Sequence, residues 1–203
     1  LFISAAIGML ALAAASCQKD NTLYYGNLTM GNIREGRFVS DQGNTFNVVE
    51  QTCAGKLDTM KRAIMTCDVL NATSGAKDEY DVRLTQLSSV LTKQPIAASD
   101  ATEGELAVND PVHIGRLWYS GGYLNLYIMV PFDKTKSQKH LINLIYTKEE
   151  DGSLTFELRH NAYSDLRNDE NVNMVLGANY VSFPILDIVN AENAKITIKC
   201  KWY

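Results

Sequence analysis

The sequence predicts an all-β protein with two domains, an OB-like small barrel at the N-terminus followed by a C-terminal β-sandwich. Short runs of alternating apolar and polar residues recur along the chain, separated by turn residues, and no stretch has a convincing helical period. The alternation is lost over residues 93–110, which gather Pro, Ala, Ser, Asp and Gly. This segment divides the chain into two parts of similar length.

The start of the chain has the pattern of a targeting signal. Residues 1–16 are almost all small or apolar, and Cys17 follows where this run stops. The run is shorter than the roughly 20 residues that span a bilayer, but it has the length of a signal-peptide core that ends in small residues. Residues 14–17 (AASC) resemble a bacterial lipobox, in which the cysteine thiol is acylated. We expect residues 1–17 to be a lipoprotein signal peptide ending at a lipidated Cys17, and an ordinary secretory signal is the alternative.

Composition and charge limit the range of functions that the protein can have. Of the 203 residues 46% are hydrophobic and 21% are charged, with only 4 Pro, which is typical of a globular protein. The net charge of −4 is evenly spread. Because there is no basic patch to collect phosphates, we expect no nucleic-acid partner.

The cysteines downstream of Cys17 are Cys53, Cys67 and Cys200, an odd number that cannot all pair internally. Cys67 and Cys200 fall on apolar faces of predicted strands, which favours buried thiols. A Cys53–Cys67 disulfide stays open as an alternative. No CxxC or Cys/His cluster has metal-ligand spacing, so the sequence predicts no metal and no cofactor.

Residues 22–95 hold the predicted barrel. About five short strands follow one another in some 70 residues, a number that fits the OB fold. They are residues 23–30, a hairpin of 37–40 and 45–49, then 62–70 and 80–85.

Residues 96–110 are predicted to be the linker, and residues 111–203 to be the sandwich. The run 123–132 is apolar on both faces, which indicates a central strand covered on both sides. The other predicted strands are 112–118, a hairpin of 140–148 and 153–160, a strand over 180–188 interrupted by Pro184, and 195–203.

Several of these segments together resemble the NigD-like lipoproteins of Gram-negative gut and oral bacteria. They are the lipobox, the turn 40–43, and the segments 118–125 (WYSGGYLN), 140–144 (HLINL), 158–165 (LRHNAYSD) and 181–184 (VSFP). The resemblance implies an OB-like domain followed by a β-sandwich. The family takes its name from a gene beside a bacteriocin, which suggested an immunity role, and it supplies no catalytic motif.

The candidate binding residues are Trp118, Tyr119 and Tyr123, which surround Gly121-Gly122. Aromatic faces beside backbone-exposing glycines suit a sugar ring. The alternative, which we favour, is that Trp118 and Tyr123 pack in the domain interior, because large aromatic residues are by default core-formers.

Two histidines and an aspartate suggest an acid–base or metal group, but a structural role is favoured. His140 and His160 each fall on the inward face of a predicted strand, and Asp165 follows shortly after. A buried histidine bonded to a neighbouring Asn or backbone carbonyl is the account that we favour. The acidic loop 165–171 lacks the EF-hand pattern, and Ser120 lies in YSGG rather than G-x-S-x-G. We therefore predict no catalytic residue and no enzyme.

The sequence thus predicts a bacterial envelope lipoprotein of the outer membrane, held by acylated Cys17, with the surface and the periplasmic face both open. Its expected function is that of a non-enzymatic binding module for a protein or glycan partner. The alternative is a bacteriocin-immunity-type protein that sequesters or shields against a toxin.

Overall fold

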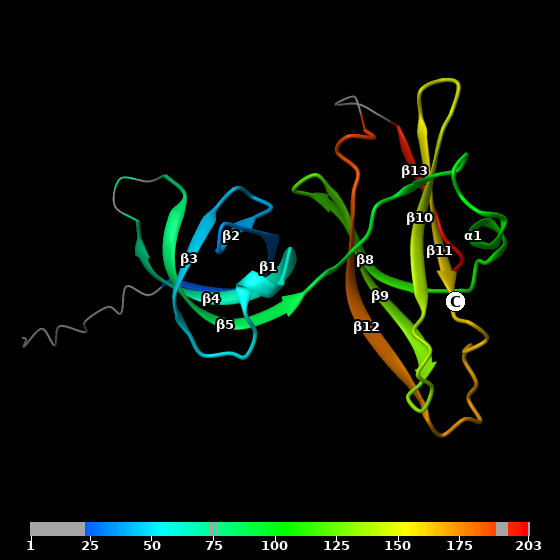
Figure 1. The fold of residues 1–203 in the computed structure, drawn as a ribbon, viewed down its shortest axis with the longest axis horizontal. Helices are drawn as coiled ribbons and strands as arrows, with labels where there is room; N and C mark the ends of the chain where they lie inside the picture. The colour runs from blue at the N-terminus through cyan, green and yellow to red at the C-terminus, as the bar shows by residue number, and fades with distance from the viewer. Residues whose placement is uncertain (1–22, 74, 76, 190–194, 203) are drawn as a thin grey trace, which may run out of the picture.

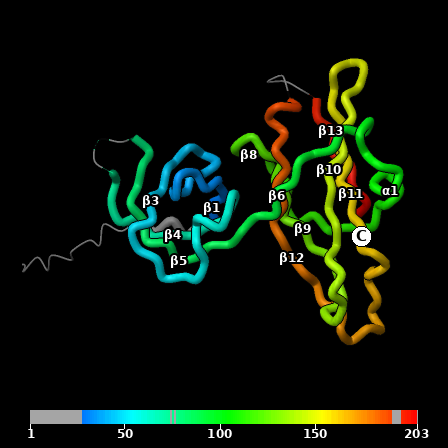
Figure 2. Tube along the Cα trace, viewed as in Figure 1, coloured from blue at the N-terminus to red at the C-terminus, as the bar shows by residue number. Residues whose placement is uncertain are grey.

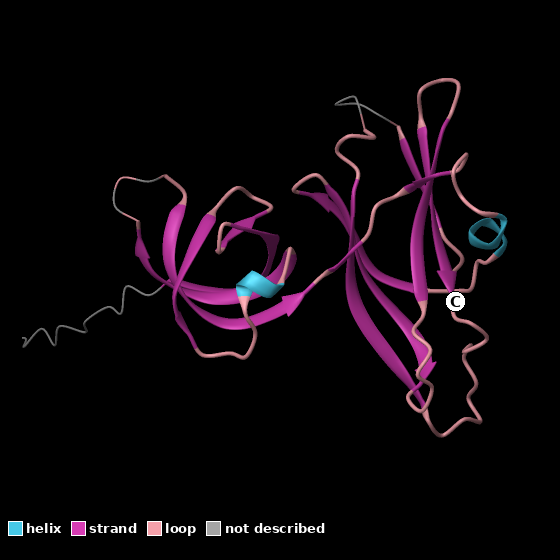
Figure 3. Ribbon diagram, viewed as in Figure 1, coloured by secondary structure: helices cyan, strands magenta, loops and turns pink. Residues whose placement is uncertain are grey.

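The fold was analysed in a computed structural model that describes residues 23–73, 75, 77–189 and 195–202 (Figure 1). The predicted signal segment and Cys17 lie outside these ranges. The regular structure of the described chain consists almost entirely of strands, arranged as a small barrel beside a two-sheet sandwich (Figure 3). The predicted all-β class is confirmed.

The N-terminal domain is a closed five-stranded barrel with the strand order β1-β2-β3-β5-β4. β1 closes it by pairing with β2 and with β4, and β3 pairs in parallel with β5. Alternate side chains fill the interior, and the largest buried ones are Phe38, Phe46, Met65 and Leu84. The elements are β1 (Leu23–Arg34), β2 (Arg37–Ser40), β3 (Thr45–Gln51), the 3-10 turn η1 (Leu57–Thr59), β4 (Arg62–Ala72) and β5 (Glu79–Ser89).

Gly31 allows β1 to lie close against β2. A Cβ at this position would be 2.3 Å from the carbonyl oxygen of Val39 and 2.7 Å from the ring of Phe38. Since no side chain fits there, the sharp curvature of a small barrel depends on a glycine at this point in the strand.

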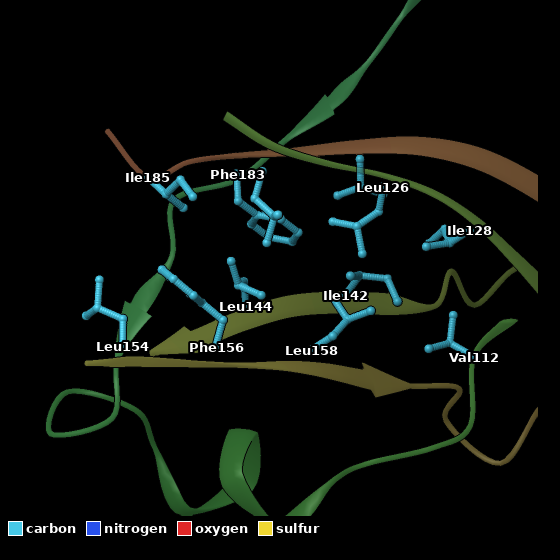
Figure 4. Packing of buried hydrophobic residues seen from close by; sticks show 12 residues of the cluster. Val112, Leu126, Ile128, Ile142, Leu144, Leu154, Phe156, Leu158, Phe183 and Ile185 are labelled. Carbon is cyan, nitrogen blue, oxygen red and sulfur yellow. The ribbon is translucent and has the colours of Figure 1, made fainter. Parts of the chain in front are cut away.

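The C-terminal domain is a sandwich of two four-stranded sheets, ordered β6-β12-β9-β8 and β13-β11-β10-β7. Side chains from the two inner faces interlock, as Figure 4 shows for Leu126 and Phe183 of one sheet above Leu144, Phe156 and Leu158 of the other. The strands are β6 (Leu91–Thr92), β7 (Ile96–Ala97), β8 (His113–Ser120), β9 (Tyr123–Asp133), β10 (Leu141–Lys148), β11 (Leu154–Asn161), β12 (Met174–Pro184) and β13 (Ile196–Lys199).

The segment predicted as a linker, residues 96–110, is folded into the sandwich instead. It contains β7, which pairs with β10, and the short helix α1 (Glu103–Ala107). Thr102 and Glu105 form a capping box at the start of α1. The T-x-x-E spacing signals such a cap in sequence, but a helix of 5 residues is too short to show a helical period. The sequence interpretation therefore missed it.

β6 and β7 lie on either side of the crossing between the sheets. β6 pairs with β12 in one sheet, and after three intervening residues β7 begins and pairs with β10 in the other. Figure 2 shows this stretch leaving the barrel and running onto the sandwich. We call residues 91–97 the strap, because they connect one edge of each sheet.

The barrel and the sandwich meet over a small apolar cluster. Met30, Ile64 and Val90 are buried there, and Trp118 and Tyr180 of the sandwich pack against them. The two domains thus share a packed apolar contact.

A buried arginine joins the two domains beside this cluster. All five N–H groups of the Arg62 guanidinium are used: two donate to the Asp41 carboxylate at 2.9 and 2.7 Å, one to Asn32 at 3.3 Å, one to Asn125 at 2.9 Å and one to Ser182 at 3.0 Å. Asp41 and Asn32 belong to the barrel, whereas Asn125 and Ser182 belong to the sandwich. A guanidinium presents five donors in a fixed fork, so Arg62 fixes the relative orientation of its four partners.

Two further contacts extend this network. The Tyr123 ring lies over the guanidinium at 3.9 Å, and the Ser120 hydroxyl donates to Asp41 at 2.6 Å. Gly121, in the left-handed region at φ 59°, lets the β8–β9 turn approach, because a Cβ there would meet the Asp41 carboxylate at 2.4 Å. The side chains of Arg62 and Asp41 are each 1% exposed, so this ion pair is almost wholly removed from water.

Arg62→Met is expected to lower the free energy of unfolding by about 3–5 kcal/mol, because the Asp41 carboxylate would stay buried without a countercharge. Chemical denaturation followed by tryptophan fluorescence measures the change. The matched control is Arg83→Met, which removes an exposed ion pair to Glu50 and should cost less than about 1 kcal/mol. Equal losses in the two variants would contradict the account.

Candidate functional site

The three aromatic residues of the predicted platform do not share one surface. Trp118 lies on the outer face of its sheet and packs against the domain junction. Tyr123 is on the same face but covers the Arg62 guanidinium. Tyr119 points to the opposite face and is 56% exposed. Because the rings of Trp118 and Tyr123 pack at the domain junction, the three residues do not form an open stacking surface for a sugar.

The described cysteines Cys53, Cys67 and Cys200 are free thiols in this structure. Cys67 is buried in the barrel core, and burial raises the pKa of its thiol to about 11. Cys200 packs against the sandwich core, and burial raises its pKa as well. Both thiols are therefore held in the unreactive protonated form.

The structure brings His140, His160 and Asp165 together. Nε2 of His160 lies 3.0 Å from Nδ1 of His140, and Nε2 of His140 lies 3.4 Å from Oδ2 of Asp165. At the other end, Nδ1 of His160 lies 3.0 Å from the carbonyl oxygen of Pro111. The imidazoles therefore form a chain between two groups that only accept hydrogen bonds.

The number of N–H groups limits how many of these hydrogen bonds the two imidazoles can form at once. The three links need three N–H groups, but two neutral imidazoles carry only two. With both rings neutral and the His160 Nδ1–H donating to Pro111, the single N–H of His140 serves either the link to His160 or the link to Asp165.

Asp165 also ties two loops to the sandwich. Its carboxylate accepts from the Lys136 ammonium at 2.9 Å and from the backbone N–H of Asp133 at 3.0 Å. Burial alone would raise the pKa of Asp165, but the hydrogen bonds from Lys136, Asp133 and His140 outweigh it, so the pKa is lowered. Asp165 is therefore an anion at neutral pH and holds the loop after β9 against the loop after β11.

Asp133 secures the same region from the end of β9. Its carboxylate accepts from the Thr135 hydroxyl, the Asn171 side-chain amide and the Thr135 backbone N–H, which lower its pKa to about 2. The acidic loop predicted from sequence is thus fastened by side-chain hydrogen bonds. Among the described residues, no group of three or more His, Cys, Asp or Glu side chains is placed to hold a metal ion.

An open groove lies beside this cluster, between the end of the barrel and the loop after β9. It has a volume of about 950 Å³, and we call it the edge groove because it runs along the edge of β12. Figure 1 shows β9 and β12 continuing past the start of β10 on this side of the sandwich. The groove is lined by residues 89–92, by Ile128, Val130 and Phe132, by residues 136–140 and by residues 177–179.

The histidine cluster and the edge groove share two residues. Lys136 and His140 line the groove, and each also contacts Asp165. Sequence reasoning found the histidines but missed the groove, because its walls come from four separate segments. Loss of alternation after Asp133 is the one local signal that marks the loop at its rim.

Comparison with protein-family models matches residues 94–203 to the NigD-like C-terminal beta sandwich domain. This match covers more than half of the chain. The chain belongs to the NigD-like family. The resemblance identified from the sequence motifs is confirmed, and none of the curated proteins searched matches this chain.

Solved structures share the fold of this NigD-like protein. A NigD-like immunity protein from Bacteroides caccae has a TM-score of 0.59 and 20% identity, over 87% of this chain and 85% of that chain. A protein from Parabacteroides distasonis, provisionally named toxin-related, has a TM-score of 0.58 and 23% identity, over 78% of this chain and 77% of that chain. A protein from Bacteroides fragilis, provisionally named a lipoprotein, has a TM-score of 0.54 and 13% identity, over 87% of each chain. At these identities the likeness concerns the fold alone.

The described part of this family member was also searched for membrane-spanning helices. No helix within it is both long enough and apolar enough to cross a bilayer.

Acidification below neutral pH is expected to destabilise the protein through His160. Burial lowers the pKa of His160 below the value of about 6.5 for an unfolded chain. The unfolded chain therefore takes up the proton first, and the free energy of unfolding falls as the pH drops through that value. Denaturation between about pH 7.5 and 5 measures the slope, which should be shallower in His160→Gln.

The control is His113→Gln, which changes a half-buried histidine packed on Trp202 instead. It gives the slope of a variant in which the His140–His160 chain is intact. The account fails if His160→Gln has the wild-type slope, or if an NMR titration places the His160 pKa above the ordinary value.

Proposed function

We propose that this NigD-like protein is a lipid-anchored envelope protein that binds a partner protein through its sandwich domain and catalyses no reaction. The edge groove carries this proposal, because it is an open surface with an apolar floor beside an unpaired strand edge. Acylated Cys17 would hold the chain at the outer membrane, and the name of the Bacteroides fragilis neighbour is consistent with that anchor.

A protein partner is favoured over a glycan. Sugar-binding sites use exposed aromatic faces, whereas Trp118 and Tyr123 are engaged at the domain junction. The groove instead offers aliphatic side chains and Phe132, which suit apolar side chains of another protein.

The absence of catalysis in this proposal rests on how the polar groups are used. His140 and His160 bond to each other, to a backbone carbonyl and to Asp165. No described serine or cysteine is hydrogen-bonded to either ring, so neither histidine is placed to activate a nucleophile.

Bacteriocin immunity is the second candidate function. Its specific support is the naming of the Bacteroides caccae neighbour as an immunity protein and of the Parabacteroides distasonis neighbour as toxin-related. In this version the partner protein in the edge groove is the toxin, and binding it keeps it from its target.

The anchor is tested by fractionating cells that express the wild type, Cys17→Ala or the matched control Cys53→Ala. Wild type and Cys53→Ala should sediment with membranes and be released by detergent, while Cys17→Ala should be soluble. Protease added to intact wild-type cells then distinguishes the surface, where the protein is digested, from the periplasm, where it is protected. Retention of Cys17→Ala in the membrane fraction would refute lipid anchoring.

The immunity role is tested by exposing sensitive cells to culture medium from a toxin-producing strain. Cells expressing the wild-type protein should survive at least about tenfold more toxin than cells expressing Lys139→Glu, which alters the groove rim, if toxin binding depends on that charge. Protection by neither protein would leave the general binding role and remove the immunity version.

A further inference from the structure

The edge of β12 that borders the edge groove is open over most of its length. Only Val181 and Ser182 of β12 pair with β6, and no other described strand pairs on that side. The Ser182 carbonyl accepts from the backbone N–H of Lys93, so the even-numbered residues of β12 point their backbone groups away from β9. The N–H and C=O groups of Leu176 and Ala178 therefore face the open edge.

This open edge has a defined upper end. The backbone N–H of Tyr180 donates to the side chain of Asn179 at 2.8 Å. The backbone donor next to β6 is therefore already hydrogen-bonded. Below it, the strand is exposed: Leu176 is 66% exposed, and Ala178 is exposed as well. An unpaired edge of this kind is a template for pairing with another extended chain.

The floor of the groove beneath this edge is apolar. Ile128, Val130 and Phe132 of β9 point inward between the sheets, and Leu91 of the strap closes one end. Gly177 leaves space that the Phe132 ring occupies, since a Cβ there would lie 2.7 Å from that ring. The floor therefore presents an apolar surface against which alternate apolar side chains of a paired strand can pack.

The rim of the groove carries two lysines. Lys136, which also bonds to Asp165, and Lys139 line it, and the lining residues include no Asp or Glu. In a chain with a net charge of −4, a rim with lysines and no carboxylate favours an anionic partner. Lys139 takes part in none of the ion pairs found among the described residues.

We propose that the edge groove binds an extended peptide segment of a partner protein that alternates apolar and acidic residues, added as a strand to β12. Its backbone pairs with Leu176 and Ala178, its apolar side chains contact Val130 and Phe132, and its carboxylates meet the lysines of the rim. Strand addition is an established mode of peptide recognition, in which main-chain hydrogen bonds supply affinity and side-chain pockets supply specificity.

Other occupants fit the groove less well. A fatty acid would satisfy the apolar floor and one lysine, but would leave the backbone groups of Leu176 and Ala178 unpaired. A second copy of this chain pairing edge to edge would place two Lys139-containing rims close to one another, and like charges there oppose association. A peptide satisfies the backbone, the floor and the rim together.

This inference rests on the proposed binding function and names the class of partner. The probe is an eight-residue peptide that alternates valine with glutamate, titrated into the folded protein at low salt. The first control peptide alternates valine with lysine, and the second is the glutamate peptide with every second backbone amide N-methylated. Fluorescence anisotropy measures affinity, and NMR hydrogen exchange reports on the Ala178 amide.

The glutamate peptide should bind and slow exchange of the Ala178 amide, and both control peptides should bind at least about tenfold more weakly. Lys139→Glu should weaken binding of the glutamate peptide about tenfold and strengthen that of the lysine peptide. The matched control Lys148→Glu, an exposed residue at the far end of β10, should behave as the wild type.

The inference is overturned if the glutamate peptide does not bind at millimolar concentration, or if N-methylation has no effect. It is also overturned if oleate binds the groove more tightly than the peptide, or if light scattering shows a dimer that excludes the peptide. These results leave the proposed function standing if a partner protein still cross-links to another face of the sandwich. If cross-linking in cells finds no protein partner on any face, the proposed function itself fails.

Discussion

The structure depends on the full satisfaction of one buried guanidinium. Arg62 uses its five donors on four side chains drawn from both domains, and an aromatic ring covers its face. Removing two charges from water is costly unless the geometry is good and every remaining donor is bonded. A lysine has three donors and no fork, so it could not hold the same partners. The two domains are consequently held in one arrangement by a polar contact that tolerates little variation.

Two charged contacts hold the walls of the edge groove in place. At one end, Ser89 and Val90 line it where the chain leaves the barrel, next to the junction that Arg62 fixes. At the other end, Asp165 holds Lys136 and the loop after β9. Both anchors lie outside the apolar floor. The groove therefore keeps its walls apart even though aliphatic side chains on its two sides would gain by closing over one another.

Local sequence pattern accounts for the fold better than for the site. The alternation over residues 80–85 and 154–160 predicts strands because each places one face in a core, and the structure has β5 and β11 there. The first half of β12 was missed, since Gly177, Ala178 and Asn179 show no alternation and face an open edge rather than a core. The orientation of Trp118 and Tyr123 toward the barrel could not be read from the sandwich sequence alone.

The Arg62 network was beyond sequence reasoning for a physical reason. An arginine at the start of a strand normally keeps its charge in water, and nothing local distinguishes this one. Its partners Asp41, Asn125 and Ser182 are 21, 63 and 120 residues away. Hydrogen bonds between such distant residues leave no periodic trace. The histidine cluster was partly foreseen, because His160 sits on the inward face of a well-patterned strand, but its link to Asp165 depends on how two loops fold back.

The strap shows that the segment matched by the family model and the set of strands paired in the sandwich do not begin at the same residue. The family match begins at residue 94, between β6 and β7. A polypeptide cut at that boundary would keep the partner of β10 but lose the partner of β12, and one cut at residue 111 would lose both. β6, which directly follows the last barrel strand, is thus part of the sandwich, so exchanging one domain for another during evolution would require the incoming barrel to bring a compatible edge strand with it.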